Sequence, residues 1–205
     1  MKHAFFITGT DTGIGKTYVA CQLIREYVAQ GYRVVGMKPV AAGCEFIDGL
    51  WVNEDVALLT QASNVKAPFH LVNPYCFNAP IAPHIAASQQ GVEVQLEVIQ
   101  RAFIALSEMA DIVIVEGAGG LLVPLNAHAT IADLIALLNI PIVLVVGMRL
   151  GCINHALLTY AVIQSRQLPI SAWVANPIDK TMQCFDENLF TLQQSMSPLP
   201  QRLMV

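Results

Sequence analysis

The sequence predicts an α/β fold in which helices cover both faces of a doubly wound, mainly parallel sheet. Short apolar runs recur along the chain, helical patterns lie between them, and no internal repeat or low-complexity linker breaks this alternation. Strands that alternate with crossover helices are typical of parallel sheets. Because 205 residues make a domain of ordinary size, we expect residues 1–205 to form a single domain.

Five runs are predicted to be strands because almost all of their residues are apolar. Strands of this kind are buried on both faces, as in a parallel sheet. They cover residues 4–8, 33–37, 111–116, 141–146 and 170–175. The apolar stretch 131–148 contains Asp133, Asn139 and Pro141, so we interpret it as a helix followed by a strand and not as a membrane span.

Two helices are predicted from apolar residues spaced three or four positions apart. One stripe consists of Val19, Leu23 and Tyr27, and the other of Leu96, Ile99, Phe103 and Leu106. Gly31 is expected to cap the first helix at its C-terminus. Ligands of doubly wound sheets gather beyond the carboxyl ends of the strands, so the residues at those ends are the candidates for chemistry.

The composition argues against several classes of partner and site. A net charge of −4 provides no basic field, so nucleic acid is not an expected partner. The cysteines form no C-x-x-C pair, so we expect neither a disulfide framework nor a zinc site, and most cysteines should be small core residues. They are Cys21, Cys44, Cys76, Cys152 and Cys184. The five histidines show no metal-ligand spacing, and no G-x-S-x-G motif is present, so zinc-enzyme and hydrolase functions lack support.

Two expectations concern the protein's surroundings. Residues 1–13 hold a short apolar run without a small-residue cleavage site, so we expect a cytoplasmic protein that does not bind membranes. With 55% hydrophobic and 13% charged residues, some apolar surface should be covered by a second subunit, which predicts an oligomer.

The strongest chemical signal is the segment GTDTGIGKT at residues 9–17, directly after the first predicted strand. A turn of this composition aims backbone N–H groups and a helix N-terminus at a polyphosphate. Lys16 would reach the outer phosphates, and the Thr17 hydroxyl would lie on Mg²⁺. Five residues separate Gly9 from Gly15, one more than in the standard motif. The segment predicts a P-loop NTPase fold, although a glycine-rich turn with an exposed lysine is the alternative.

Three further residues occupy strand or helix ends. Glu116 follows the buried run DIVIV and precedes three glycines and an alanine, so it is a magnesium-ligand candidate, or else the partner of a buried cation. Lys38 leaves the second strand just before Pro39 and could share one anionic centre with Lys16, as in phosphoryl transfer, or be a solvated lysine. Asp55 begins an apparent helix and could simply complement its dipole.

Several motifs in this order resemble the dethiobiotin synthetase family. They are GTDTGIGKT, YRVVGMKPVAAG, NED, VNPYCF, SEMADIVIVEGAGG, VLVVGMRLGCINHALLT and AWVANP. The resemblance covers the chain to about residue 200. ATPases that partition DNA or build cobalamin share the first motif but not the whole set. A partitioning or cell-division ATPase switch and an inactive ATP-binding homologue are the alternatives.

The resemblance implies an ATP-dependent, Mg²⁺-requiring cyclo-ligase of biotin biosynthesis that forms carbon–nitrogen bonds. The substrate would be 7,8-diaminononanoate, whose amine takes up CO₂, supplied by bicarbonate, to give a carbamate. ATP would phosphorylate this carbamate, and the second amine would attack the mixed anhydride to close the ring of dethiobiotin. Lys16 and Lys38 would then screen the repulsion between carbamate and γ-phosphate.

The resemblance also assigns site residues in a single ATP-binding domain. The catalytic residues would be Thr12, Lys16 and Lys38, and the metal ligands Thr17, Asp55 and Glu116. ATP would contact these three ligands together with Gly13, Ile14, Gly15, Lys16, Tyr18, Gly117, Ala118, Gly119, Asn176 and Pro177. The substrate would contact Thr12, Lys38, Ala42 and, across a homodimer, Cys152, Ile153 and Asn154.

The chain departs from the family's pattern at four places. Gly13 stands where the family often has Glu, and Ala42 stands where it often has Ser. Pro177 replaces a more usual Asp and removes a backbone donor beside the expected base-reading Asn176. The family continues beyond the residues PLPQRLMV, so we expect a C-terminal segment that is short relative to the family.

Overall fold

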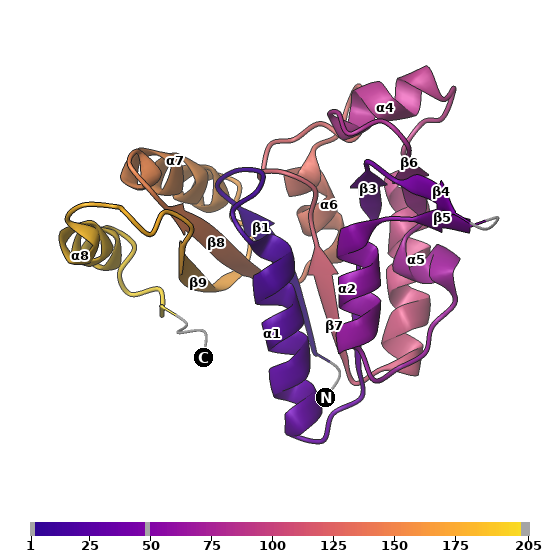
Figure 1. The fold of residues 1–205 in the computed structure, drawn as a ribbon, viewed down its shortest axis with the longest axis horizontal. Coiled ribbons are helices and arrows are strands. Elements are labelled where there is room, and N and C mark those ends of the chain that lie inside the picture. The colour runs from indigo at the N-terminus through magenta and orange to yellow at the C-terminus, as the bar shows by residue number, and fades with distance from the viewer. Residues whose placement is uncertain (1–2, 48–49, 202–205) are drawn as a thin grey trace.

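The computed structural model of the chain describes residues 3–47 and 50–201 (Figure 1). Five parallel strands form its main sheet, in the order β2-β7-β1-β8-β9. They are β1 (His3–Gly9), β2 (Val34–Met37), β7 (Ile112–Glu116), β8 (Ile142–Met148) and β9 (Ile170–Pro177). These five strands confirm the five predicted ones, with ends that differ by one or two residues. The strand order reverses direction at β1, which has β7 on one side and β8 on the other. Doubly wound folds bind ligands beyond the carboxyl end of the strands at such a point.

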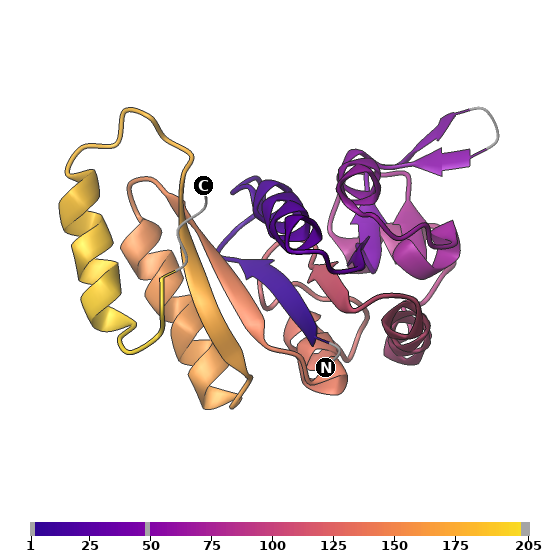
Figure 2. The same ribbon diagram turned by 90° about the horizontal axis from the view of Figure 1, so that it is seen from below.

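Helices cover both faces of this sheet, as predicted (Figure 2). On one face, α1 (Lys16–Ala29) and α2 (Glu54–Ala62) pack on side chains such as Ile7 and Ile114. The opposite face packs against α5 (Leu96–Met109), α6 (Ile131–Leu138) and α7 (Cys152–Ser165). The last helix, α8 (Phe185–Ser195), lies against α7. The two-sided burial explains why the strands lack alternating polar residues.

The predicted helix ends follow from local chemistry. Gly31 has φ 89°, and the N–H groups of Gly31 and Tyr32 donate to the carbonyls of Val28 and Tyr27, which confirms the predicted C-terminal cap of α1. Segment 131–148 forms α6 followed by β8, also as predicted. Within residues 3–47 and 50–201, no helix is long and apolar enough to cross a membrane.

The chain between β2 and α5 builds a small accessory layer that the sequence did not predict in detail. It contains a parallel strand pair, a hairpin and two short helices, and it lies beside the carboxyl ends of β2 and β7 (Figure 1). Its elements are β3 (Val40–Ala42), β4 (Glu45–Ile47), β5 (Leu50–Val52), α3 (Phe69–Val72), β6 (Tyr75–Phe77) and α4 (Pro83–Gln89).

One expectation about the cysteines is wrong. Cys44 and Cys76 form a disulfide between residues 32 positions apart in the sequence, with their Cα atoms 6.1 Å apart. The cause is the pairing of β3 with β6, which the sequence pattern did not reveal because both strands are only three residues long. Cys21 and Cys152 are buried, as expected, whereas Cys184 is exposed.

Candidate active site

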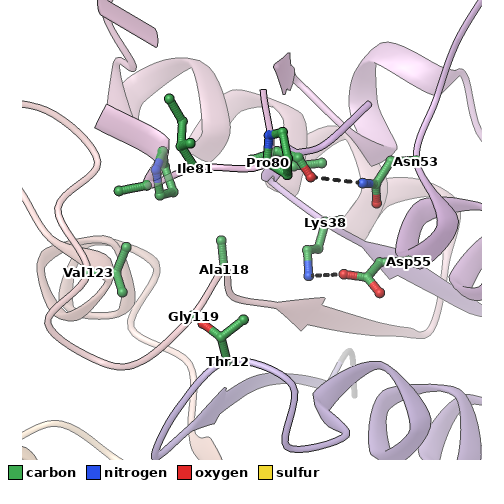
Figure 3. Close-up of a pocket in the computed structure, with 13 residues that line it drawn as sticks. Thr12, Lys38, Asn53, Asp55, Pro80, Ile81, Ala118, Gly119 and Val123 are labelled. Carbon is green, nitrogen blue, oxygen red and sulfur yellow. Dashed lines mark hydrogen bonds and ion pairs between the residues drawn. The ribbon is translucent and has the colours of Figure 1, made fainter. Parts of the chain in front are cut away.

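A cavity of about 480 Å³ opens where the carboxyl ends of the central strands meet the accessory layer (Figure 3). The loops after β1 and β7 form one side of it, through Thr12 and through Ala118 and Gly119. The accessory layer and the start of α2 form the other side. Their lining residues include Ala42, Asn53, Asp55, Pro80 and Ile81, and Lys38 enters from the end of β2. The cavity therefore brings together residues predicted to bind substrate, metal and ATP.

The glycine-rich loop between β1 and α1 has the backbone conformation that its sequence predicts. Gly13 and Gly15 have φ values of 70° and 86°, which favour glycine. A Cβ atom on Gly15 would also clash with the Asn176 side chain. Within this loop Lys16 is buried, and its Nζ donates to the carbonyl oxygen of Asp11 at 2.7 Å. Burial, together with the charge of Lys38, lowers the pKa of Lys16 to about 8, although nearby carboxylates oppose the shift.

Four side chains from four separate parts of the chain meet at the cavity. Lys38 Nζ lies 2.5 Å from Glu116 Oε1 and 2.7 Å from Asp55 Oδ2. The Thr17 hydroxyl lies 2.7 Å from Asp55 Oδ1 and 3.0 Å from Glu116 Oε1. The parallel register brings the ends of β2 and β7 side by side, while the N-terminus of α2 supplies Asp55. The prediction that Lys38, Glu116 and the loop with Lys16 and Thr17 share one edge of the sheet is confirmed. Asp55, which only the family resemblance placed there, joins them.

The charges in this cluster depend on one another. Burial alone would lower the pKa of Lys38, but attraction to Glu116 and Asp55 outweighs it, so the pKa of Lys38 lies above its usual value. Burial raises the pKa of Glu116 despite the neighbouring ammonium. Burial would also raise the pKa of Asp55, but Lys38 and the Thr17 hydroxyl hold it below its usual value. In this structure Glu116 is thus the partner of a buried lysine, the alternative that its sequence position left open.

The oxygen atoms of the cluster also fit Mg²⁺. Thr17, Asp55 and Glu116 provide the hydroxyl and carboxylate oxygens that this ion prefers, and Glu116 Oε2 is buried without a hydrogen-bond partner. Across the described ranges, no group of three His, Cys, Asp or Glu side chains could hold a metal ion. Two carboxylates and a hydroxyl leave coordination positions for phosphate oxygens and water, as is usual for Mg²⁺ bound with a nucleotide.

Two asparagines that the sequence did not single out hold this cluster in place. Asn73 is buried, and its Nδ2 donates to the carbonyls of Lys38 at 2.6 Å and Tyr75 at 3.0 Å. The Lys38 N–H donates to Val72 O at 2.9 Å, so the main chain of Lys38 is held from both sides by residues 72–73. Asn73 lies in the quoted motif VNPYCF, but the sequence assigned it no role, because its partner Lys38 is 35 positions away.

Asn53 has a recognisable signal, because it directly precedes a helix with acidic residues in its first turn. Its Oδ1 accepts from the Val56 N–H at 3.3 Å, and its Nδ2 donates to the Ala42 carbonyl at 3.2 Å (Figure 3). Asn53 thereby ties the helix that carries Asp55 to the strand that carries Ala42.

The residues expected to contact the base lie on the other side of the glycine-rich loop. Asn176 is the second-to-last residue of strand β9, and its Nδ2 donates to the Ile14 carbonyl at 2.7 Å. Asn176 therefore braces the loop in addition to any contact with a base. Pro177 is exposed next to it, and Tyr18 is exposed in the first turn of α1.

The remaining predicted substrate residues do not line the cavity. Cys152, Ile153 and Asn154 form the first turn of α7, beyond β8, and none of them lines the cavity. Cys152 is buried, Ile153 is partly buried, and Asn154 is exposed. A further ion pair, between Arg149 and Asp11 at 2.5 Å, links the residues before α7 to the glycine-rich loop.

Solved structures with a similar fold include a ParA family ATPase and a cell division protein. A ParA family ATPase from Chlorobium tepidum aligns with a TM-score of 0.54 at 16% identity, over 94% of this chain and 81% of that one. The MinD cell division protein of Aquifex aeolicus also gives a TM-score of 0.54, at 14% identity over 93% and 78% of the two chains. At these identities the likeness shows the fold alone, which confirms the predicted P-loop NTPase type.

Sequence relatives are much closer. A family model described as an AAA domain matches residues 3–200. An ATP-dependent dethiobiotin synthetase BioD from Nitrosospira multiformis is 54% identical over 96% of this chain and 85% of its own length. An enzyme of the same name from Xylella fastidiosa is 49% identical over 96% of this chain and 87% of its own. The chain therefore belongs to the ATP-dependent dethiobiotin synthetase family.

Proposed function

We propose that the cavity between Thr12, Lys38 and Gly119 is where this chain carries out its family's reaction, the ATP-dependent synthesis of dethiobiotin. As a family member the chain is a ligase of biotin biosynthesis that forms carbon–nitrogen bonds. The observation that carries the assignment to this cavity is the cluster in which the buried Lys38 and Glu116 meet the half-buried Asp55 and Thr17, next to Lys16. Burying the charges of Lys38 and Glu116 costs free energy, and buried charges of this kind are typical of functional sites.

The substrates are proposed to be 7,8-diaminononanoate, CO₂ and ATP. One amine attacks CO₂ and loses a proton, which gives a carbamate. A carbamate oxygen then attacks the γ-phosphorus, the bond to the bridging oxygen breaks, and ADP leaves. The second amine attacks the carbonyl carbon of this mixed anhydride and loses a proton, phosphate leaves with the oxygen that came from CO₂, and the cyclic urea is complete.

The residues have distinct proposed roles in this sequence. Lys16 and Lys38 stabilise the transferring phosphoryl group and bring two anions together, and Thr12 orients the diamine at the cavity wall. Mg²⁺, when bound, neutralises phosphate charge, and Thr17, Asp55 and Glu116 are its proposed ligands. The loop from Gly13 to Tyr18 and residues 117–119 are proposed to hold the phosphates, and Asn176 and Pro177 to contact the base.

We also propose that the active unit is a homodimer in the cytoplasm. Leu122, Leu150 and Leu158 are exposed around α7, and apolar surface of this kind is typical of a contact between subunits. A second subunit could bring the first turn of its own α7 to this cavity. The N-terminus of that 14-residue helix is suited to the carboxylate of the substrate.

The experiment is an assay of the purified protein with MgATP, bicarbonate and the diamine. We expect ADP, phosphate and dethiobiotin to form in equal amounts, and phosphate release to require the diamine. ATP hydrolysis at the same rate with and without the diamine would indicate an ATPase switch. Tight ATP binding without any turnover would indicate an inactive homologue.

A further inference from the structure

We propose that Lys38 acts as an internal substitute for the divalent cation, and that cation binding releases its ammonium group toward the cavity. This inference rests on the proposed function, in which Thr17, Asp55 and Glu116 hold Mg²⁺. It goes further by stating that the cation and the Lys38 ammonium group compete for the same oxygen atoms.

The hydrogen bonds of the cluster carry the proposal. Lys38 Nζ donates to Glu116 Oε1 at 2.5 Å and to Asp55 Oδ2 at 2.7 Å, and it lies 3.5 Å from the carbonyl of Gly117. The Thr17 hydroxyl, which has one proton to donate, lies within hydrogen-bond distance of Asp55 Oδ1 and of Glu116 Oε1. Three of the four carboxylate oxygens therefore already accept a hydrogen bond, and only Glu116 Oε2 has no partner. A cation that binds both carboxylates therefore competes with these hydrogen bonds for the same oxygen atoms.

Electrostatics make Lys38 the group that must move. Its side chain is only 6% exposed, and the Glu116 side chain is 1% exposed, so water screens the pair poorly. One ammonium and two carboxylates leave a single net negative charge. A divalent cation added beside a stationary Lys38 would reverse this charge and repel the ammonium at close range.

The structure also restricts how Lys38 can move. Its main chain is held by Val72 O and by Asn73 Nδ2, so any displacement falls on the flexible side chain. Lys38 itself lines the cavity, opposite Thr12 and Gly119 (Figure 3). An ammonium group released from the carboxylates would therefore enter the space proposed for carbamate and γ-phosphate. Lys38 would thus become available to the reacting anions only after the cation has bound.

The test measures binding of Mn²⁺, a spectroscopic substitute for Mg²⁺, to nucleotide-free protein by electron paramagnetic resonance. Removal of the competing charge in Lys38→Met should tighten Mn²⁺ binding by about tenfold or more. Lys16→Met is the matched control, because it removes a second buried ammonium whose Nζ contacts the Asp11 carbonyl and no carboxylate oxygen. We expect a clearly smaller change in that variant. Equal affinities of Lys38→Met and the wild type, or no binding by either, would overturn the proposal.

A second measurement needs no variant, in case Lys38→Met does not fold. Crystals of the wild-type protein with ADP are compared with and without Mn²⁺. Lys38 Nζ should contact Glu116 and Asp55 only in the metal-free crystals. Bound Mn²⁺ together with unchanged Lys38 contacts would contradict the proposal. Neither result depends on dethiobiotin formation, so failure of this inference and failure of the proposed function can be told apart.

Discussion

The two neighbouring strands β2 and β7 carry an ion pair at each end, and the two pairs differ sharply. At the amino end, Arg33 pairs with Asp111, with side chains that are 60% and 37% exposed. At the carboxyl end, five residues further along each strand, Lys38 pairs with Glu116, with side chains that are 6% and 1% exposed. Strand register and charge types are the same, so burial and partners are what differ.

The amino-end pair is complete in itself. Arg33 donates to both carboxylate oxygens of Asp111 through its side chain and once more through its backbone N–H. The carboxyl-end pair is incomplete, because Glu116 Oε2 is buried without a partner and Lys38 is shared with Asp55. An exposed ion pair contributes little to stability. A buried pair with an unsatisfied oxygen costs free energy, so its presence suggests a binding role for that oxygen. Burial and missing partners, more than charge, therefore distinguish the end of the sheet at which we propose the reaction.

The largest expected effect comes from neutralising the acid at each end of β7. Glu116→Gln removes a proposed metal ligand and the charge opposite Lys38, so kcat should fall by about 10²–10³. Asp111→Asn changes an exposed acid on the same strand and should leave kcat and KM unchanged. Steady-state kinetics at several Mg²⁺ concentrations measure both. Similar losses in the two variants would remove the proposed difference between the ends.

A smaller effect is expected from the asparagines that hold the two ends of β2. Asn73→Ala frees the main chain of Lys38, whereas Asn64→Ala removes contacts to Val34 and Tyr32 at the opposite end. Each variant should lose about 1–2 kcal/mol of unfolding free energy in urea. Only Asn73→Ala should also lower kcat, by roughly tenfold, with little change in the KM for ATP. Equal kcat values in the two variants would show that Asn73 has only a structural role.

The last, more gradual effect concerns pH and separates the two buried lysines. Lys16 has a pKa lowered to about 8, so it loses its proton as pH rises through 8, whereas the raised pKa of Lys38 keeps that group charged. Because phosphates bind the ammonium form, affinity for ADP should be level below about pH 7. It should then fall, by at most about tenfold per pH unit, above pH 8.

Titration calorimetry with ADP across this range checks that expectation. Lys16→Arg stays protonated throughout, so its affinity should show no such decline. A wild-type affinity that is constant from pH 7 to 9.5 would contradict the lowered pKa of Lys16.

The sequence predicted the main sheet because each buried strand is an almost unbroken apolar run. It also placed Lys38, Glu116 and Lys16 together, since the carboxyl ends of parallel strands and the following loop share one edge. The family resemblance added a metal role for Asp55, which its helix position alone did not require. These predictions depend on local patterns, and the structure arranges these residues accordingly.

The accessory layer was not predictable in the same way. Strands β3 and β6 have three residues each and pair across 35 positions, so no periodicity reveals them. The disulfide between Cys44 and Cys76 and the hydrogen bond from Asn73 to the Tyr75 carbonyl both depend on that pairing. Long-range contacts thus form the side of the cavity that the accessory layer lines. The charged residues Lys38 and Glu116, by contrast, could be placed from local sequence patterns.

In the proposed reaction, carbamate and γ-phosphate react with each other in the cavity beside Lys38. The measurement uses ¹⁸O-labelled bicarbonate with ATP and the diamine, and the reaction is stopped before the bicarbonate exchanges its label with water. The released phosphate is then analysed by mass spectrometry. We expect one ¹⁸O atom per phosphate, because a carbamate oxygen that came from CO₂ leaves with it. Phosphate without ¹⁸O, formed along with dethiobiotin, would contradict this claim.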